Sequence, residues 1–166
     1  MKTLVAYFSA EFGATAKVAK ELAAAVGADL FEITPEKPYT PADLRWTNPL
    51  ARCNREHLAG KDVPVAGTVE NFDQYDTVLL GFPIWYGYAP IVVSTFCKQY
   101  DWSGKRIYAF ATSGGSGIGR TAEKLQPLRQ GRRRSGREAR THCGGRHAMD
   151  RLSTGTALHG KEERTK

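Results

Sequence analysis

A stretch near the N-terminus combines hydroxyl side chains with glycine just before a predicted helix. Residues 9–15 read SAEFGAT, with Ser9 and Thr15 as hydroxyl donors and Gly13 as a position where the backbone can approach a ligand closely. The first turn of a helix presents unpaired N–H groups and a partial positive charge. This stretch can therefore bind a phosphate without lysine or arginine, and a capped turn without a ligand is the alternative.

A second stretch, residues 83–90, places aromatic residues side by side directly after an apolar run. Exposing the adjacent rings of Trp85 and Tyr86 to water is unfavourable unless something flat covers them. A flat ligand ring or a partner protein would provide that cover, and aromatic side chains folded back onto the core are the alternative. The candidate contacts in this stretch are Pro83, Ile84, Trp85, Tyr86 and Gly87.

A third stretch, residues 112–119, reads TSGGSGIG and holds four glycines in its last six residues. Such a loop offers many backbone N–H donors and allows close approach to the polar edge of a ligand. A flexible linker is the alternative, but a linker rarely interrupts a tight strand-to-helix connection. The candidate contacts here are Thr112, Ser113, Gly114 and Gly115.

Strands and helices alternate along the chain in a way that brings the three stretches together. Short apolar runs rich in β-branched and aromatic residues predict strands at 3–8, 30–33, 77–82 and 106–111. Between and after them we predict helices at 16–26, capped by Thr15 and ended by Gly27, and at 50–58, 91–100 and 119–128. This order predicts an α/β fold with a doubly wound parallel sheet, whose ligands bind beyond the carboxyl ends of the strands.

These stretches resemble the loops of the flavodoxin family, in the right order and each after the right strand. The sequences YFSAEFGATAKVAKELA, GFPIWYGYAP and TSGGSGIG are similar to its phosphate loop, its flavin-stacking loop and its last flavin-contacting loop. The proline-rich stretch 35–46 (PEKPYTPADLRW) resembles a bacterial flavodoxin-like subgroup. The resemblance runs from residue 2 to about residue 128, and the first loop departs from it by one extra residue and by the charge of Glu11.

The resemblance implies flavin mononucleotide (FMN) as the cofactor and electron transfer through it as the function. Ser9, Gly13, Ala14 and Thr15 match the loop that holds the FMN phosphate. The residues of the second stretch match the loop along the flavin ring, and those of the third match the loop near its pyrimidine edge. No residue of the sequence demands a catalytic role. The partner would be a redox protein or a small electron acceptor, and a homodimer stays open.

Other functions fit parts of the sequence. An NAD(P)H-dependent quinone or nitro-compound reductase on the same fold is the first alternative, because residues 1–128 are net neutral whereas electron-shuttle flavodoxins are strongly acidic. A nucleotide-binding P-loop is disfavoured because Arg120 stands where that motif needs lysine. The three cysteines form no Cys-x-x-Cys pair, which disfavours a zinc site or a disulfide framework and suits the cytoplasm. No apolar run is long enough to span a membrane.

The last part of the chain differs from the rest in composition. Residues 1–128 hold 13 Lys+Arg and 13 Asp+Glu, whereas residues 129–166 hold 11 Lys+Arg and 4 Asp+Glu, a net charge of +7. We therefore predict a domain at 1–128 and a basic, disordered or aberrant tail at 129–166. Nucleic-acid binding is one explanation of the tail, and a shifted reading frame, which we favour, is the other. Without an ordinary fifth strand and closing helix, we expect the outer edge of the fourth strand to stay unpaired.

Overall fold

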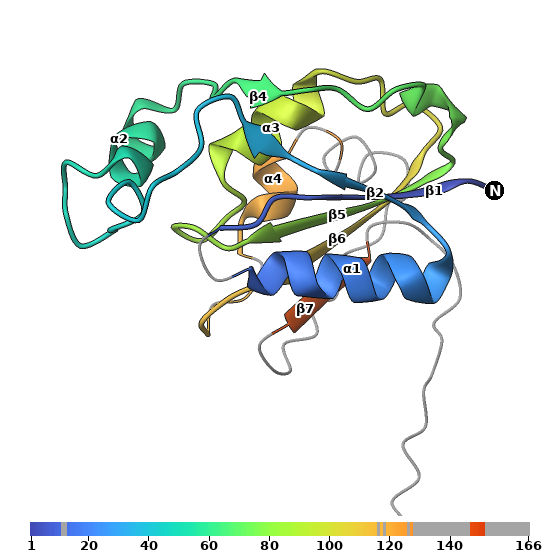
Figure 1. Ribbon diagram of the computed structural model, residues 1–166, viewed down its shortest axis with the longest axis horizontal. Helices are drawn as coiled ribbons and strands as arrows, with labels where there is room; N and C mark the ends of the chain where they lie inside the picture. Colours follow the sequence, from blue (N-terminus) through green and yellow to red (C-terminus); the bar gives the residue numbers. More distant parts are fainter. Residues whose placement is uncertain (11–12, 116, 118, 126, 128–146, 152–166) are drawn as a thin grey trace, which may run out of the picture.

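The computed structural model describes residues 1–10, 13–115, 117, 119–125, 127 and 147–151. Its main sheet has the strand order β2-β1-β5-β6-β7 (Figure 1). The strands are β1 (Thr3–Tyr7), β2 (Asp29–Glu32), β5 (Thr77–Pro83), β6 (Arg106–Thr112) and β7 (His147–Arg151). The first four in that order are parallel, which confirms the predicted α/β fold, and β7 runs antiparallel to β6.

Each face of the sheet is covered by helices, as a doubly wound fold requires. Helix α1 (Ala14–Val26) lies on one face and places the small buried residues Ala19 and Ala23 against Val5 and Leu79. Helix α3 (Ile91–Lys98), the 3₁₀ helix η1 (Phe72–Gln74) and helix α4 (Thr121–Lys124) lie on the other face. The expected helix at 91–100 is confirmed, although β-branched residues begin it, because two parallel strands need a crossover between them.

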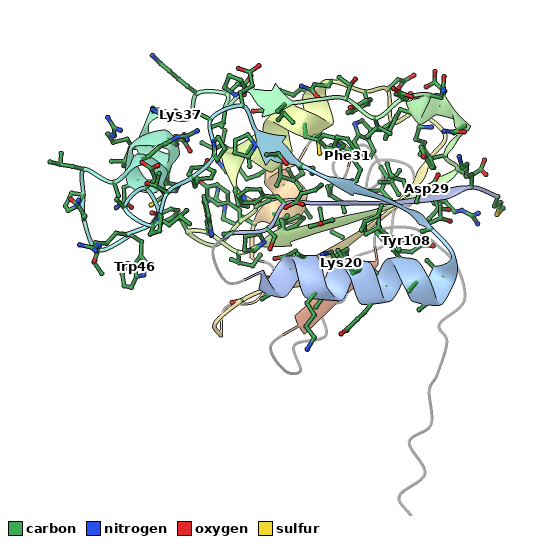
Figure 2. All side chains as sticks on the ribbon, in the orientation of Figure 1. Lys20, Asp29, Phe31, Lys37, Trp46 and Tyr108 are labelled. Carbon is green, nitrogen blue, oxygen red and sulfur yellow. The ribbon has the colours of Figure 1, made fainter. Side chains whose placement is uncertain are left out.

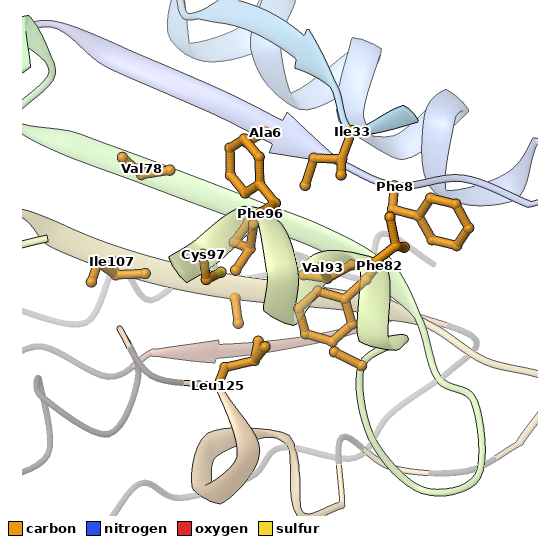
Figure 3. Packing of buried hydrophobic residues seen from close by; sticks show 14 of the residues in the cluster. Ala6, Phe8, Ile33, Val78, Phe82, Val93, Phe96, Cys97, Ile107 and Leu125 are labelled. Atoms are coloured by element: carbon orange, nitrogen blue, oxygen red, sulfur yellow. The ribbon is translucent and has the colours of Figure 1, made fainter. Parts of the chain in front are cut away.

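The larger core cluster fills the side of the sheet that faces α3 (Figure 3). Phe82 on β5 and Phe96 on α3 are fully buried there, together with Val93 and Cys97. Burial of this size stabilises a fold by about 1.5–3 kcal/mol for each large apolar side chain. Cys97 packs on the inner face of its helix, and burial raises the pKa of its thiol.

Residues 34–66 leave the main sheet, and the part at residues 38–59 lies beyond the carboxyl ends of its strands (Figure 1). A two-stranded antiparallel pair joins β3 (Thr34–Pro35) to β4 (Val65–Ala66), in a region expected to be loop at its start. Between them lies helix α2 (Arg52–Ala59), close to the predicted 50–58. This part projects from the end of the sheet, and Trp46 lies on the lower edge of the projection in the view of Figure 2.

Two sequence predictions about this fold were wrong. Thr15 does not cap α1, because the helix begins one residue before it and Gly13 is the cap, with φ at 63°. The outer edge of β6 is not unpaired, because β7 pairs with it from Tyr108↔Arg151 to Thr112↔His147. An antiparallel ladder is made by backbone groups and needs no apolar pattern, so the sequence of the tail did not reveal it. The other residues of the predicted tail lie outside the described part of the chain.

No helix in the described part of the chain has the length and apolar character needed to cross a membrane.

Candidate functional site

The loops that follow β1, β5 and β6 surround one cavity of about 600 Å³ at the carboxyl ends of these strands. Ten of the thirteen residues predicted from the sequence line it: Ser9, Gly13, Ala14, Thr15, Pro83, Ile84, Trp85, Tyr86, Thr112 and Gly114. Gly87, Ser113 and Gly115 do not line it, although they belong to the same loops. The structure therefore brings together the three stretches that the sequence singled out.

Four lining residues were not predicted: Ala10, Leu44, Trp46 and Cys53. Leu44 and Trp46 come from the proline-rich segment, and Cys53 comes from the first turn of α2. No local pattern marks them, because they reach the cavity only after the segment between β3 and β4 folds over the strand ends. The resemblance of the proline-rich stretch to one flavodoxin-like subgroup was the signal that pointed to part of this wall.

The loop after β1 turns tightly into α1. The N–H of Gly13 donates to the carbonyl of Ala10 at 2.9 Å, and Gly13 has a left-handed φ that favours glycine. Ser9 Oγ accepts a hydrogen bond from the N–H of Ala16 at 3.2 Å, so Ser9 supplies the side-chain contact expected of Thr15. The N–H groups of Ala14 and Thr15 stand in the first turn, where a helix leaves donors without intrahelical partners.

A buried hydroxyl pair ties this loop to the loop after β6. Thr15 Oγ1 and Thr112 Oγ1 lie 2.7 Å apart, and both residues are buried. The two side chains come from positions 97 residues apart in the chain. Their hydrogen bond fixes the beginning of α1 against the carboxyl end of β6. The loop after β1 and the loop after β6, which form two walls of the cavity, are therefore held at a fixed distance from each other.

The aromatic loop after β5 is a tight hairpin. Trp85 and Tyr88 exchange both backbone hydrogen bonds, at 2.9 and 3.1 Å, across Tyr86 and Gly87. These two residues have φ values of 51° and 83°, which is the backbone of a two-residue type I′ turn. A left-handed conformation costs a non-glycine residue roughly 1–2 kcal/mol, so contacts elsewhere must hold Tyr86 in place.

Side chains of α2 provide those contacts. The hydroxyl of Tyr86 donates to Cys53 Sγ at 3.4 Å and contacts Asn54 Oδ1. The ring of His57 stacks on that of Tyr86 with centroids 4.2 Å apart, and His57 Nδ1 lies 2.7 Å from the hydroxyl of Tyr88. Burial, together with the contact to Cys53, raises the pKa of Tyr86, so its hydroxyl stays protonated and donates.

Trp85 lies on the inner side of the hairpin and is half-buried. Its ring meets those of Phe8 and Tyr39 edge-on, with centroids 5.6 and 5.5 Å apart. The alternative that both aromatic residues fold back onto the core therefore describes Trp85 in part and does not describe Tyr86, which is 41% exposed.

The glycine-rich loop after β6 touches the hairpin through Gly119. The N–H of Arg120 donates to the carbonyl of Gly87 at 3.1 Å. A Cβ atom on Gly119 would lie 2.2 Å from that carbonyl oxygen, and φ of Gly119 is 56°. Only glycine combines this backbone conformation with so close an approach. The hairpin after β5 and the loop after β6 are therefore in direct contact at Gly119.

The lining of the cavity is uncharged over the part of the chain that the structure describes. On one side stand the hydroxyl groups of Ser9, Thr15 and Thr112, with the N–H groups of the first turn of α1 and the positive end of its dipole. The rings of Trp85 and Tyr86 stand on another. This donor set suits a ligand with an anionic group at one end and a flat ring at the other, because neutral donors can bind a phosphate at a helix N-terminus. Glu11 lies outside the described residues.

A smaller hollow of about 200 Å³ adjoins the cavity and shares Ser9, Ala10 and Leu44 with it. Its other walls come from Phe8, from residues 32–34 at the end of β2, which include the carboxylate of Glu32, and from the proline-rich segment with Tyr39. Arg52 holds that segment against α2: its guanidinium donates to the carbonyl of Lys37 and lies 4.3 Å from the centre of the ring of Tyr39.

Comparison with known proteins identifies the class to which this fold and site belong. The sequence profile of the flavodoxin family matches residues 2–136, so the chain belongs to the flavodoxin family. Two solved structures of Bacteroides proteins assigned as flavoproteins are similar to it. The protein from Bacteroides eggerthii is 45% identical over 75% of this chain and 79% of its own, with a TM-score of 0.72. The one from Bacteroides uniformis is 42% identical over 75% and 80%, with a TM-score of 0.71.

A third solved structure supports the fold alone. The flavoprotein of Lactobacillus acidophilus, crystallised in complex with FMN, is 23% identical over 76% of this chain and 85% of its own, with a TM-score of 0.63. No functionally curated protein shows significant similarity to the chain.

Proposed function

We propose that this flavodoxin-family protein binds FMN in the cavity at the strand ends and carries electrons through it. The observation that carries the proposal is the meeting of three loops around one uncharged cavity, with helix N–H groups at one side and aromatic rings at another. The FMN complex of the Lactobacillus acidophilus protein, which has the same fold, supports the choice of ligand. Bound FMN would accept and release one or two electrons.

The residues of the chain would bind and orient the cofactor. Ser9, Gly13, Ala14 and Thr15 would hold the phosphate, because their hydroxyl and N–H groups stand at the positive end of α1. Pro83, Ile84, Trp85 and Tyr86 would lie along the ring, with Gly87 shaping the turn. Thr112 and Gly114 would contact the pyrimidine edge, and we assign Ser113 and Gly115 to the same loop without direct exposure to the cavity.

A titration of FMN fluorescence with the full-length chain tests this proposal. We expect quenching that saturates, and a dissociation constant for Trp85→Ala that is about tenfold larger, because stacking on an aromatic ring contributes about 0.5–1.5 kcal/mol beyond the area it buries. Trp85→Phe is the matched control, since it keeps a flat ring at this position and should lose less affinity. Absence of quenching by a chain whose circular dichroism shows it folded would contradict FMN binding.

An NAD(P)H-dependent reductase of quinones or nitro compounds is the second candidate. The hollow of about 200 Å³ beside the cavity favours it, since a small acceptor could bind there next to the cofactor. The net neutral charge of residues 1–128 also fits it better than a strongly acidic shuttle. Consumption of NADPH by the FMN-loaded chain in the presence of a quinone would distinguish the reductase from an electron carrier.

We further propose that residues 1–128 are the functional domain of a cytoplasmic protein and that residues 129–166 are an aberrant segment, although β7 within it pairs with β6. Among the described residues, all those that line the cavity lie between positions 9 and 114, which supports the first part. The abrupt gain of basic residues after position 128 supports the second. Sequencing an independent copy of the gene tests the shifted frame, and recovery of the same tail in the same frame would contradict it.

A further inference from the structure

The segment of residues 37–61, which forms one side of the cavity, differs in charge from the rest of the domain. It holds five Lys+Arg and two Asp+Glu, a net charge of +3, whereas the other residues of 1–128 hold eight and eleven, a net charge of −3. Arg52 pairs with Glu56 inside the segment at 2.5 Å. Arg45 and Arg55 are exposed, and neither has an ion pair among the described residues.

The same segment exposes three large apolar side chains, one of which also lines the cavity. Trp46 is 73% exposed and also lines the cavity, so it connects the cofactor site to the surface. Leu50 and Leu58 are 78% and 81% exposed. Figure 2 shows Trp46 on the lower edge of this projection. Tryptophan and arginine are the residue types enriched at the centres of protein interfaces, and grouped apolar exposure beside a functional site marks a contact surface.

Asn54 orders this surface and couples it to the cavity. Its Nδ2 donates to the carbonyls of Trp46 and Asn48, at 2.8 and 2.7 Å, while its Oδ1 contacts the hydroxyl of Tyr86. One side chain of α2 therefore holds both the loop that carries Trp46 and the hairpin of the cavity wall. A surface fixed before binding loses less entropy when a partner docks.

We propose that Trp46, Leu50, Arg45 and Arg55 form a docking surface for an acidic electron-transfer protein. The net positive charge of the segment would attract an acidic partner, and Trp46 would place that partner's redox centre beside the cavity. One electron would pass between the metal centre of the partner and the bound cofactor, and no bond would form or break. This inference rests on the proposed FMN site, because an electron-transfer partner can exchange an electron with this chain only if a redox cofactor is bound in the cavity.

The observations favour a protein partner over a membrane surface. Helix α2 has eight residues, and along it only Leu58 among the large apolar side chains is well exposed, so it lacks the long apolar face of an interfacial helix. Asp43 and Glu56 also stand among the basic residues, and Glu56 pairs with Arg52 at 2.5 Å, which weakens the attraction of this segment to anionic lipid.

The test measures binding of the FMN-loaded full chain to a plant-type [2Fe–2S] ferredoxin, an acidic electron-transfer protein, by calorimetry. We expect binding that weakens with salt and is roughly tenfold weaker for Arg55→Glu at low salt, because that change reverses a charge at the rim. Trp46→Ala should weaken binding at low and high salt alike. Lys20→Glu, an equal change of charge on the exposed side of α1, is the matched control and should bind like the original chain. The basic tail is identical in all variants, so its charge cancels from these ratios.

Three results would overturn the proposal. Equal weakening by Lys20→Glu and Arg55→Glu would show attraction by net charge without a site. Failure of ferredoxin to bind, with capture by anionic phosphatidylserine vesicles that Trp46→Ala abolishes, would make this surface a membrane contact. Dimerisation lost in Arg55→Glu would make the occupant a second copy of the chain. FMN fluorescence quenching, measured on the same samples, shows independently whether the proposed cofactor site is intact.

Discussion

Replacing Gly119 by alanine should move the glycine-rich loop after β6 away from the hairpin after β5 and destabilise the fold. A Cβ at this position would lie 2.2 Å from the carbonyl oxygen of Gly87, so the two loops must move apart by about an ångström to restore an ordinary contact. That movement breaks the hydrogen bond from the N–H of Arg120 to the same oxygen. Gly119 also has a φ of 56°, which alanine adopts only with strain.

The expected magnitude follows from these contributions. The left-handed backbone costs alanine about 1–2 kcal/mol. Loss of the hydrogen bond adds about 0.5–1.5 kcal/mol, so the free energy of unfolding should fall by about 1.5–3.5 kcal/mol. Gly27→Ala is the matched control, because Gly27 has a φ of 64° at the end of α1 and a Cβ there would have nothing within 4 Å. It should show only the backbone cost.

Urea unfolding of both variants, with FMN titrations on the same samples, measures this difference. We expect Gly119→Ala to be less stable than Gly27→Ala by at least about 0.5–1.5 kcal/mol, the share of the broken hydrogen bond. FMN affinity should fall only in Gly119→Ala, since Gly27 lies at the end of α1 opposite the cavity. Equal stability and equal affinity of the two variants would refute the close approach of the loops as a cause.

Other consequences of the structure are open to measurement. Thr15→Val or Thr112→Val should each cost about 1–3 kcal/mol, because each leaves a buried hydroxyl unpaired, and the double variant should cost less than the sum in a double-mutant cycle. Burial, reinforced by the carboxylate of Glu32, raises the pKa of Tyr7 from its ordinary 10.0 to about 12. Stability should therefore be full below pH 10 and fall as the pH rises towards 12, and urea unfolding of Tyr7→Phe should show less of this loss. Asn54→Ala should weaken FMN binding, measured by fluorescence titration, more than Asn54→Asp does. The aspartate keeps an oxygen that accepts the hydrogen bond of the Tyr86 hydroxyl.

The sheet and the three loops could be predicted because their causes are local. Strands β1, β5 and β6 are short apolar runs, and parallel strands buried on both faces are required to be apolar throughout. Thr15, Trp85 and Gly114 stand at the ends of such runs, and the topology alone brings strand ends together. Ten predicted residues therefore line one cavity without any knowledge of the segment between β3 and β4.

The remaining wall could not be predicted because its causes are long-range. Trp46 and Cys53 reach the cavity only through the packing of α2, and Asn54 acts through hydrogen bonds to carbonyls that a sequence does not reveal. The error at Thr15 has a similar origin. Its hydroxyl is a good helix cap by type, but here it pairs with Thr112, which lies 97 residues away, and Ser9 takes over the contact to α1.

The uncharged lining makes the rigidity of the loops the main requirement for binding. A lysine or arginine would attract an anionic ligand over a distance, whereas neutral N–H and hydroxyl donors contribute only when they already stand at hydrogen-bonding distance. The pair Thr15–Thr112, the contact of Gly119 with Gly87, and Asn54 join the three loops and α2 to one another, and each acts across a large separation in sequence. Affinity for FMN should accordingly depend on these connections as strongly as on the residues that would touch the cofactor. The connections are also absent from any single loop, so a peptide copy of the phosphate loop should not bind FMN, even though that loop carries every residue assigned to the phosphate.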